Sequence, residues 1–445
     1  METSETRFRE TGPARGARRR RSVTLVACVI VLLGPTRAEA VEATLTLEGA
    51  LATAQANNAE LSAAHSNLDV LRAQVVSAGA FPNPELSGNG APAVPDADEY
   101  DYSVGIDQQI PILGKRSKRI AVAGADLERE SMLVADLERR IAQQVRGVFR
   151  RAQVIDRRAA LAKDLAGLNE RLFDVASARF RRGEVSELDV RQFEIELAQR
   201  RQEAQRLGAE RASALLELSR LMNVRYDPAL HLAPRLAGIA EPVALAPLLE
   251  AAAQRPDLTA LTVEAGAAER ERTLRLAERW GDPVVGVFYR RERSRFDEPA
   301  VIEDTDDFVG IQVRVPLPLL YRNQGETAAA EARKRTAELR RAALELEIDR
   351  TVRDAHQRAT VQLIAVRELE HTIEAAGRAE RLAERAYANG QVSTVQLIQT
   401  QQQRFALVDA SLDALDAYYQ ALSELEGAVN APLEEFAARS SEVRP

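Results

Sequence analysis

The residue types that usually carry out chemistry are few in this sequence and lie far apart. Its four histidines, His65, His231, His356 and His371, include no pair at the i, i+4 spacing that lets one helix face hold a metal ion. A packed or surface role is the better interpretation of each. Cys28 is the only cysteine, so no disulfide can form within the chain. The sequence also lacks a Gly-Lys-Ser/Thr phosphate-binding loop. It therefore predicts no catalytic centre, no metal site and no cofactor.

The composition excludes two further classes of protein. The chain has 445 residues, with 60 basic and 67 acidic side chains and a net charge of −7. A nucleic-acid partner would require a basic face, so none is expected. Outside residues 23–33 there is no long apolar run, which argues against a helical membrane protein.

The first 40 residues have the three parts of an export signal. Arg18–Arg21 is basic, Val23–Leu33 is apolar but too short to span a bilayer, and Ala38–Ala40 matches a cleavage site. The mature chain is then expected to start near Val41. Leu25–Cys28 also resembles a lipoprotein cleavage box, so lipidation of the cysteine stays open as the lesser alternative. In either case the protein is predicted to leave the cytoplasm.

Two long blocks without proline predict long helices. No proline lies between Pro111 and Pro228 or between Pro318 and Pro432, and both blocks are rich in helix-forming residues. The helix from Lys115 to Arg181 would be roughly 100 Å long at the rise of an α-helix. Apolar residues recur every seven positions in the first block and at 3-4-3-4-3 spacing in the second, which is typical of coiled-coil packing. They are Ile120, Leu127, Val134, Ile141, Val148, Ile155 and Ala162, and then Phe405, Val408, Leu412, Leu415, Tyr419 and Leu422.

Matching turns indicate that the chain is an internal duplication. Each block is interrupted once by a Gly-x-Val-Ser turn, in which Gly183 and Gly390 suit helix C-caps and Ser186 and Ser393 suit helix N-caps. The two turns are offset by the same number of residues as Asn223 and Asn430, at the ends of the two blocks. Each half is therefore predicted to have one very long helix and a shorter returning helix.

Before each long helix the apolar period changes to two, which predicts strands at 101–110 and 308–315. One face of these strands would be apolar and would contact lipid, and the other would be polar and face water. The lipid-facing residues are Tyr102, Val104, Ile106, Val309, Ile311 and Val313, and the lumen-facing residues are Asp101, Asp107, Gln312 and Arg314.

Each of these strands has a predicted hairpin partner, at 84–89 and 284–291. The intervening loops would span about 90–99 and 292–307, so that Asp304, Asp306 and Asp307 form a solvated charge run. Phe81, Tyr100, Trp280, Tyr289 and Phe308 are expected near strand ends, as in an aromatic girdle.

Four strands are too few to close a sheet in lipid, where open edges are not tolerated and about eight strands are the practical minimum. The sheet must therefore be shared between chains. The predicted fold is mainly α with a small transmembrane β part, and three chains with four strands each would give a shared β-barrel of twelve strands.

On these features the sequence resembles the TolC-like outer-membrane efflux family, over nearly all of the mature chain. The resemblance rests on the duplicated helix and hairpin layout, the two Gly-x-Val-Ser turns and the residues Phe81–Leu86 before the first strand. Residues Gln109–Arg116 are similar to the start of the first long helix in the heavy-metal-efflux branch of that family.

The resemblance implies a domain layout: a signal peptide at 1–40, repeats at 41–225 and 246–431, a linker at 226–245 and a tail at 432–445. It also implies a trimeric channel-tunnel made of three identical chains. Its 12-stranded β-barrel would lie in the outer membrane in contact with lipid, and its long antiparallel coiled-coil α-barrel would cross the periplasm. A periplasmic adaptor would dock on the helical tips and connect the channel to an inner-membrane pump of the resistance–nodulation–division class. The tip residues expected to dock are Gly183, Val185, Ser186, Leu188, Gly390, Val392, Ser393 and Leu397. The alternative is that they only cap and turn the helices.

In this family, acidic residues beyond the tips often surround the periplasmic aperture. Here the matching positions are Asp189, Gln396 and Gln399, so a strongly acidic gate is in doubt. The resulting hypothesis is a passive efflux conduit and not an enzyme, with heavy-metal cations as the substrate suggested by branch resemblance. A drug or protein-export conduit is the alternative within the class, and a secreted coiled-coil scaffold or adhesin is the rival from another class.

Overall fold

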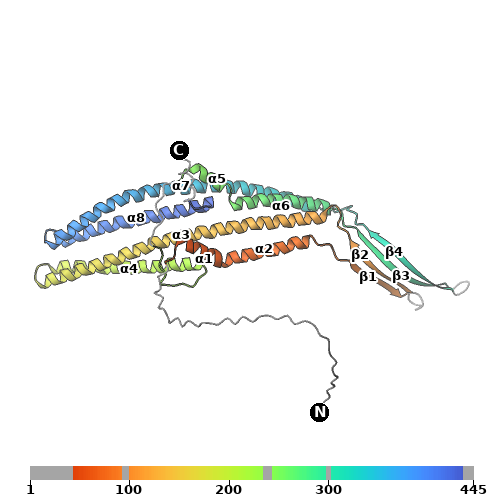
Figure 1. Cartoon of the computed structure of the whole chain (residues 1–445), viewed down its shortest axis with the longest axis horizontal. Coiled ribbons are helices and arrows are strands. Elements are labelled where there is room, and N and C mark those ends of the chain that lie inside the picture. Colours follow the sequence, from red (N-terminus) through yellow and green to blue (C-terminus); the bar gives the residue numbers. More distant parts are fainter. Residues whose placement is uncertain (1–43, 93–99, 234–242, 297–301, 434–445) are drawn as a thin grey trace, which may run out of the picture. The chain divides into compact units, whose positions relative to one another are not determined.

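The computed structural model describes residues 44–92, 100–233, 243–296 and 302–433. The predicted signal peptide with Cys28, the mature start, part of the linker and most of the C-terminal tail lie outside these residues. The elements, in chain order, are α1 (Leu47–Asn57), α2 (Ala59–Ala78), β1 (Glu85–Pro92), β2 (Tyr100–Gln109), α3 (Lys115–Arg181), α4 (Glu187–Leu221), α5 (Leu245–Ala252), α6 (Pro256–Glu278), β3 (Val284–Phe296), β4 (Ile302–Arg314), α7 (Gln324–Ala388) and α8 (Thr394–Val429) (Figure 1).

The order of elements repeats, which confirms the internal duplication. The series α2, β1, β2, α3, α4 is followed by the series α6, β3, β4, α7, α8. The local geometry repeats as well, because Asn223 and Asn430 both adopt left-handed backbone angles just past the last helix of their half. Asparagine tolerates this conformation better than most residues, so it ends a helix readily.

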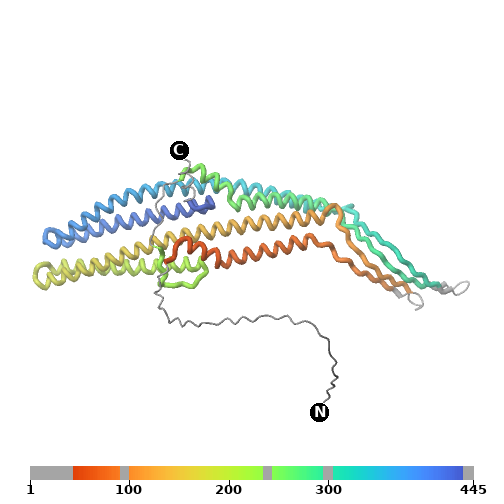
Figure 2. The backbone as a smooth tube through the Cα atoms, viewed as in Figure 1, coloured from red at the N-terminus to blue at the C-terminus, as the bar shows by residue number. Residues whose placement is uncertain are grey.

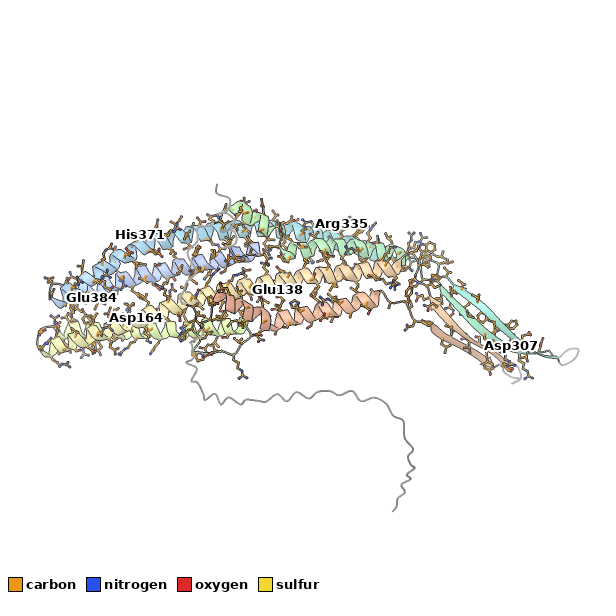
Figure 3. All side chains as sticks on the ribbon, viewed as in Figure 1. Glu138, Asp164, Asp307, Arg335, His371 and Glu384 are labelled. Carbon is orange, nitrogen blue, oxygen red and sulfur yellow. The ribbon has the colours of Figure 1, made fainter. Side chains whose placement is uncertain are left out.

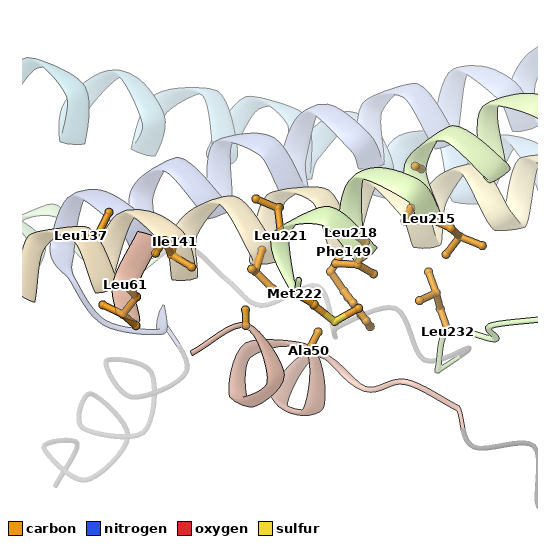
Figure 4. Packing of buried hydrophobic residues seen from close by; sticks show 14 of the residues in the cluster. Ala50, Leu61, Leu137, Ile141, Phe149, Leu215, Leu218, Leu221, Met222 and Leu232 are labelled. Atoms are coloured by element: carbon orange, nitrogen blue, oxygen red, sulfur yellow. The ribbon is translucent and has the colours of Figure 1, made fainter. Parts of the chain in front are cut away.

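The two long helices have 67 and 65 residues, and their apolar periodicity is the reason they pack. Val134 and Ile141 from the first heptad series are buried in one cluster, against which Leu127 packs. Figure 4 shows this cluster, in which Phe149 of α3 lies beside Leu218 of α4. Leu412, Leu415 and Tyr419 from the second series are buried in another cluster between α7 and α8. The predicted coiled-coil seams are therefore confirmed.

Helix α3 is covered on two sides, whereas α7 is not. Along its length α3 packs against α2 and α4 of its own half and against α6 and α8 of the other half. Helix α7 packs against α6 and α8, with α5 near its middle (Figures 1 and 2). The two halves are joined by buried ion pairs, among them Arg150 Nη1 on α3 with Glu426 Oε2 on α8 at 2.7 Å. Arg150 also donates to Ser423 Oγ at 2.9 Å.

The four strands form one antiparallel sheet in the order β1-β2-β3-β4, at one end of the long helices (Figure 1). Both predicted hairpins are present, but β3 and β4 are longer than predicted and pair as far as Phe296 and Ile302. The expected loop at 292–307 is therefore wrong over most of its length. The outer parts of these strands carry Arg, Glu and Asp, which break the apolar alternation that marks the inner parts. Among the described helices, none is both long enough and apolar enough to cross a membrane.

Candidate functional site

One face of the sheet is apolar and exposed to its surroundings. Residues paired directly across strands share a face, and two such rows are Val104–Tyr289–Val309 and Ile106–Val287–Ile311. In the described chain, Val309 is 79% exposed and Ile311 is 75% exposed. The remaining residues predicted to face lipid, Tyr102, Val104, Ile106 and Val313, are between 50% and 63% exposed. All six lie on this same face.

The opposite face is polar. The row Asp107–Gly286–Gln312 shows how it is built: the Gln312 amide donates to Asp107 Oδ1 across Gly286. A Cβ atom on Gly286 would lie only 1.9 Å from Asp107 Oδ1, so a larger residue there would displace the Asp107 carboxylate. At the outer end, Arg290 Nη2 donates to Asp101 Oδ2 at 2.7 Å. Arg314 ends β4 on this face, so the four residues predicted to line a lumen lie on one side.

Two predictions about the outer end of the sheet need correction. Asp304, Asp306 and Asp307 belong to β4 and not to a loop, and Asp307 accepts a hydrogen bond from the Tyr289 hydroxyl at 2.7 Å. Tyr289 and Phe308 lie away from the strand ends because β3 and β4 continue beyond them, so the predicted girdle is incomplete.

Two strand edges are left without a partner. In the described chain β1 pairs only with β2, and β4 pairs only with β3. The backbone N–H and C=O groups along these edges therefore still need partners. This requirement becomes severe if the apolar face lies against lipid, because no water is available there to pair with these groups.

Both hairpin tips have the predicted caps. Gly183 and Gly390 have φ angles of 75° and 72°, in the left-handed region that glycine adopts without strain. Ser186 and Ser393 begin α4 and α8 with full capping boxes, whose reciprocal partners are Asp189 and Gln396. Apart from Val185 and Val392, which are half-buried, the turn residues are exposed.

The tip residues differ in exposure in a way that the sequence motif concealed. Leu188 is 66% exposed, but Leu397 is fully buried in a cluster with Phe193 and Tyr387. Leu397 therefore holds the two hairpins together and presents no surface for docking in this structure. The exposed apolar residue at the position equivalent to Leu188 is Val395, at 43%.

Asp189 links the two tips. It accepts a hydrogen bond from Ser186 N at 3.1 Å and from Ser186 Oγ at 2.7 Å. These hydrogen bonds, followed by one from the side chain of Thr394 at the start of α8, hold the pKa of the Asp189 carboxyl below its usual range. Thr394 is buried, so α4 and α8 meet at this point. Gln396 fills the matching role in the second tip without charge, and Gln399 is exposed.

A buried ion pair that the sequence analysis missed lies where the sheet meets the helices. Lys115 Nζ, on the first residue of α3, lies 2.5 Å from Asp282 Oδ1, and the two side chains are 3% and 6% exposed. The ammonium also donates to Trp280 O, and Asp282 Oδ1 accepts from Ile112 N at 3.2 Å. The junction between β2 and α3 is thus fixed to the linker before β3. In the sequence, Lys115 is marked only by its place directly after Gly114, and nothing there indicates that it is buried or paired.

The histidines and acidic residues of the described chain are spread along its length. Within the described ranges no group of three His, Cys, Asp or Glu side chains is placed to hold a metal ion. His356 Nε2 lies 3.0 Å from Val243 O, and His65 lies 3.4 Å from Glu138. Figure 3 shows ionisable residues such as Asp307, Glu138 and Glu384 spread from the sheet to the tips. A groove of about 700 Å³ between α3, α6 and α7 has charged walls whose Arg333 and Glu271 pair with each other at 2.7 Å.

A duplicated helix and hairpin unit with one apolar and one polar sheet face defines a class of membrane-associated export proteins. The family model for outer membrane efflux proteins matches residues 50–224 and 248–431, so the chain belongs to the outer membrane efflux protein family. The two matches fall one on each half.

Named relatives agree with this assignment. The chain is 26% identical over 393 residues to the cobalt-zinc-cadmium resistance protein CzcC of Cupriavidus metallidurans, covering 86% of this chain and 89% of that protein. Its fold is similar to that of a membrane protein from Pseudomonas aeruginosa, with a TM-score of 0.70, 18% identity and coverage of 86% and 92%. It is also similar to the CmeC outer membrane channel of Campylobacter jejuni, with a TM-score of 0.70, 12% identity and coverage of 89% and 88%.

Proposed function

We propose that this protein is the outer-membrane channel of a tripartite efflux system and works as a homotrimer. The observation that carries the proposal is the four-stranded sheet, which has an exposed apolar face, a polar face and two unpaired edges. An apolar face suits lipid, a polar face suits a water-filled lumen, and the edges require further strands. Three copies joined from edge to edge would give a closed barrel of twelve strands.

The helices would continue this tube into the periplasm. Coiled-coil seams pack α3 with α4 and α7 with α8, and α3 is bordered by helices of both halves. Copies placed side by side would close the helical wall in the same way as the sheet. The chain would act as a passive conduit and not as an enzyme, and the energy for export would come from an inner-membrane pump of the resistance–nodulation–division class.

The two tips are the proposed docking points for a periplasmic adaptor. Gly183 and Gly390 turn the chain tightly, and Leu188 and Val395 expose apolar side chains beside these turns. Val185, Ser186, Val392 and Ser393 complete the two turns as backbone and cap residues.

The docking role can be tested at the two glycines. Valine at either position would have to adopt a positive φ angle, which costs a β-branched residue about 1–2 kcal/mol or more. We expect Gly183→Val with Gly390→Val to impair efflux while leaving trimers intact. Gly208→Ala is the matched control, since its position on α4 has open space around it. Normal export by the double variant would refute docking at these turns.

At the aperture we propose a weak attraction for cations. In a trimer, three Asp189 carboxylates would lie at the same height along the channel axis, while Gln396 and Gln399 add no charge. Ser186 and Thr394 already donate hydrogen bonds to the Asp189 carboxylate, which weakens its attraction for a passing cation. Salt would screen what remains.

We propose heavy-metal cations as the substrate, because the relative at 26% identity is a cobalt-zinc-cadmium resistance protein. The test is a deletion strain carrying either the wild-type gene or none, exposed to a panel of metals and drugs. Sensitivity to divalent metals alone, restored by the gene, is the expected result. Sensitivity to drugs alone would favour a drug conduit, and no change in sensitivity would count against efflux.

A further inference from the structure

The connection between β4 and α7 is the most exposed apolar segment next to the sheet. It has nine residues, 315–323, whereas the equivalent connection between β2 and α3 has five, 110–114. The longer connection contains Leu317, Leu319, Leu320 and Tyr321, which are 66%, 72%, 93% and 61% exposed. An apolar run of this kind is unfavourable in water and needs a cover.

The chain itself shows how the equivalent segment is covered. The connection after β2 lies along the linker before β3, with Ile110 N donating to Pro283 O at 2.9 Å and Ile112 N donating to Asp282 Oδ1 at 3.2 Å. The Lys115–Asp282 ion pair completes this contact. The contact is a direct result of pairing, because the segment after β2 must lie beside the segment that leads into its antiparallel partner β3.

The counterpart of that linker is the segment Phe81–Pro84. In the described chain Gln108 Nε2 donates to Pro82 O at 2.9 Å, but most of the segment is exposed. Its Asn83-Pro84 replaces the Asp282-Pro283 of the second half, and both residues are exposed, while Asp282 is only 8% exposed. Phe81 is 65% exposed although Arg116 lies over its ring at 5.0 Å. Arg116 Nε also donates to Gly79 O at 2.6 Å. The linker is thus held in place by α3, and its Phe81 ring, with Arg116 over one face, remains largely exposed.

We propose that the Leu317–Tyr321 segment of one copy packs on the Phe81–Pro84 linker of the next copy. This inference rests on the proposed trimer, in which the free edge of β4 pairs with the free edge of β1. That pairing places the segment after β4 beside the segment before β1, as β2 and β3 do within the chain. The two segments adjoin the two open strand edges, so one contact continues the other.

The contact between copies differs in chemistry from the contact within each chain. Asn83 has no charge, and the residue that follows the left-handed cap of α7 is Gln324 where α3 has Lys115. The four extra residues supply apolar surface in place of an ion pair. By analogy with the bond from Ile112 N to Asp282 Oδ1 within the chain, the Leu317 N–H group would donate to Asn83 Oδ1 of the partner subunit. Ionic junctions within chains therefore alternate with neutral, apolar junctions between chains around the ring.

Cross-linking tests the proposal. Asn83→Cys and Leu317→Cys are introduced together in a Cys28→Ala background, and detergent-extracted protein is treated with a short bis-maleimide. We expect covalent dimers and trimers from the double variant and none from either single variant. A native mass measurement is made on the same samples.

The outcomes separate this proposal from the proposed function. Trimers by native mass without cross-links would overturn the contact and leave the channel in place. Monomers in the wild-type protein would overturn both. Quenching of a fluorophore at Leu317→Cys by brominated lipid would show that the segment lies in the bilayer, which also overturns the contact.

A second variant measures what the contact contributes. Leu320→Glu should lower the trimer association constant by at least about tenfold, because the nearly fully exposed leucine becomes buried on assembly and a glutamate there would have to be desolvated instead. Leu133→Glu is the control, since Leu133 is 40% exposed on α3, a helix bordered on both sides within its own chain. Equal trimer stability for the two variants would refute the contribution of Leu320.

Discussion

The junctions where the two halves pass from strand to helix have the same place in the repeat and opposite surroundings. The first is closed by Lys115 and Asp282, both buried. The second ends in Leu320, which is almost fully exposed. In the first half, the segment between strand and helix is therefore packed against another segment of the same chain. In the second half, the equivalent segment has an exposed apolar surface. In a duplicated chain, such a difference indicates which surface a neighbour must supply.

The largest effect should come from breaking the finished junction. Lys115→Met removes the nearer counter-charge of the buried Asp282 carboxylate and leaves Arg119 Nη2 at 3.5 Å from Asp282 Oδ2, so we expect a cost of about 3 kcal/mol, the low end of the range for a broken buried ion pair. Gln324→Met changes the equivalent, exposed position and should cost less than about 0.5 kcal/mol. Thermal unfolding of detergent-purified protein, followed by helical circular dichroism, measures both. Lys115→Met combined with Asp282→Asn should recover part of the loss, and equal stability of Lys115→Met and Gln324→Met would contradict the account.

The two faces of the sheet give an intermediate effect. Ile311→Arg places a cation on the apolar face, at a cost of about 2–4 kcal/mol per chain near the middle of a bilayer. Gln312→Arg places the same cation on the next residue, where it can pair with Asp107. The yield of heat-modifiable protein in the outer-membrane fraction is the readout. We expect a strong loss for Ile311→Arg only, and equal yields would mean that the faces are assigned the wrong way round.

The smallest effect concerns the two capping boxes. Asp189→Asn should destabilise the first turn of α4 by about 0.5–1 kcal/mol, because a carboxylate is favourable at a helix N-terminus. For the same reason Gln396→Glu should stabilise the first turn of α8 and slow its amide hydrogen exchange. Amide hydrogen exchange at these turns measures both changes.

The pH dependence of the first tip follows from the same carboxyl. Because the pKa of Asp189 is lowered in the folded chain, its contribution is present above the ordinary aspartate pKa and is lost as the pH falls through the lowered pKa. Protection of the first turn of α4, corrected for intrinsic exchange, should stay constant from pH 8 down to about pH 5. A loss of protection within that range would contradict the assignment.

Much of the helical part was predictable because its signals are local. Heptad spacing located the buried seams at Val134 and Ile141, and the Gly-x-Val-Ser turns located both tips. The inner halves of β2 and β4 followed from strict alternation of apolar and polar residues.

What the sequence concealed depends on contacts between distant segments. Leu397 follows the exposed Gly-x-Val-Ser turn closely, which predicts docking, but Phe193 of the other hairpin helps to bury it. The outer ends of β3 and β4 carry charges such as Arg291 and Asp307, which lie opposite each other only after pairing. The Lys115–Asp282 pair joins residues 167 positions apart, and nothing local marks it.

The buried ion pair between Asp282 and Lys115 at the start of α3 also suggests an order for folding and trimer assembly. A chain can close this junction by itself, before it meets another copy, because both partners belong to one polypeptide. The neutral surface around Leu320 is complete only when the second hairpin and the start of α7 have folded. A chain truncated before the second hairpin would then lack the surface that the proposed contact between copies requires.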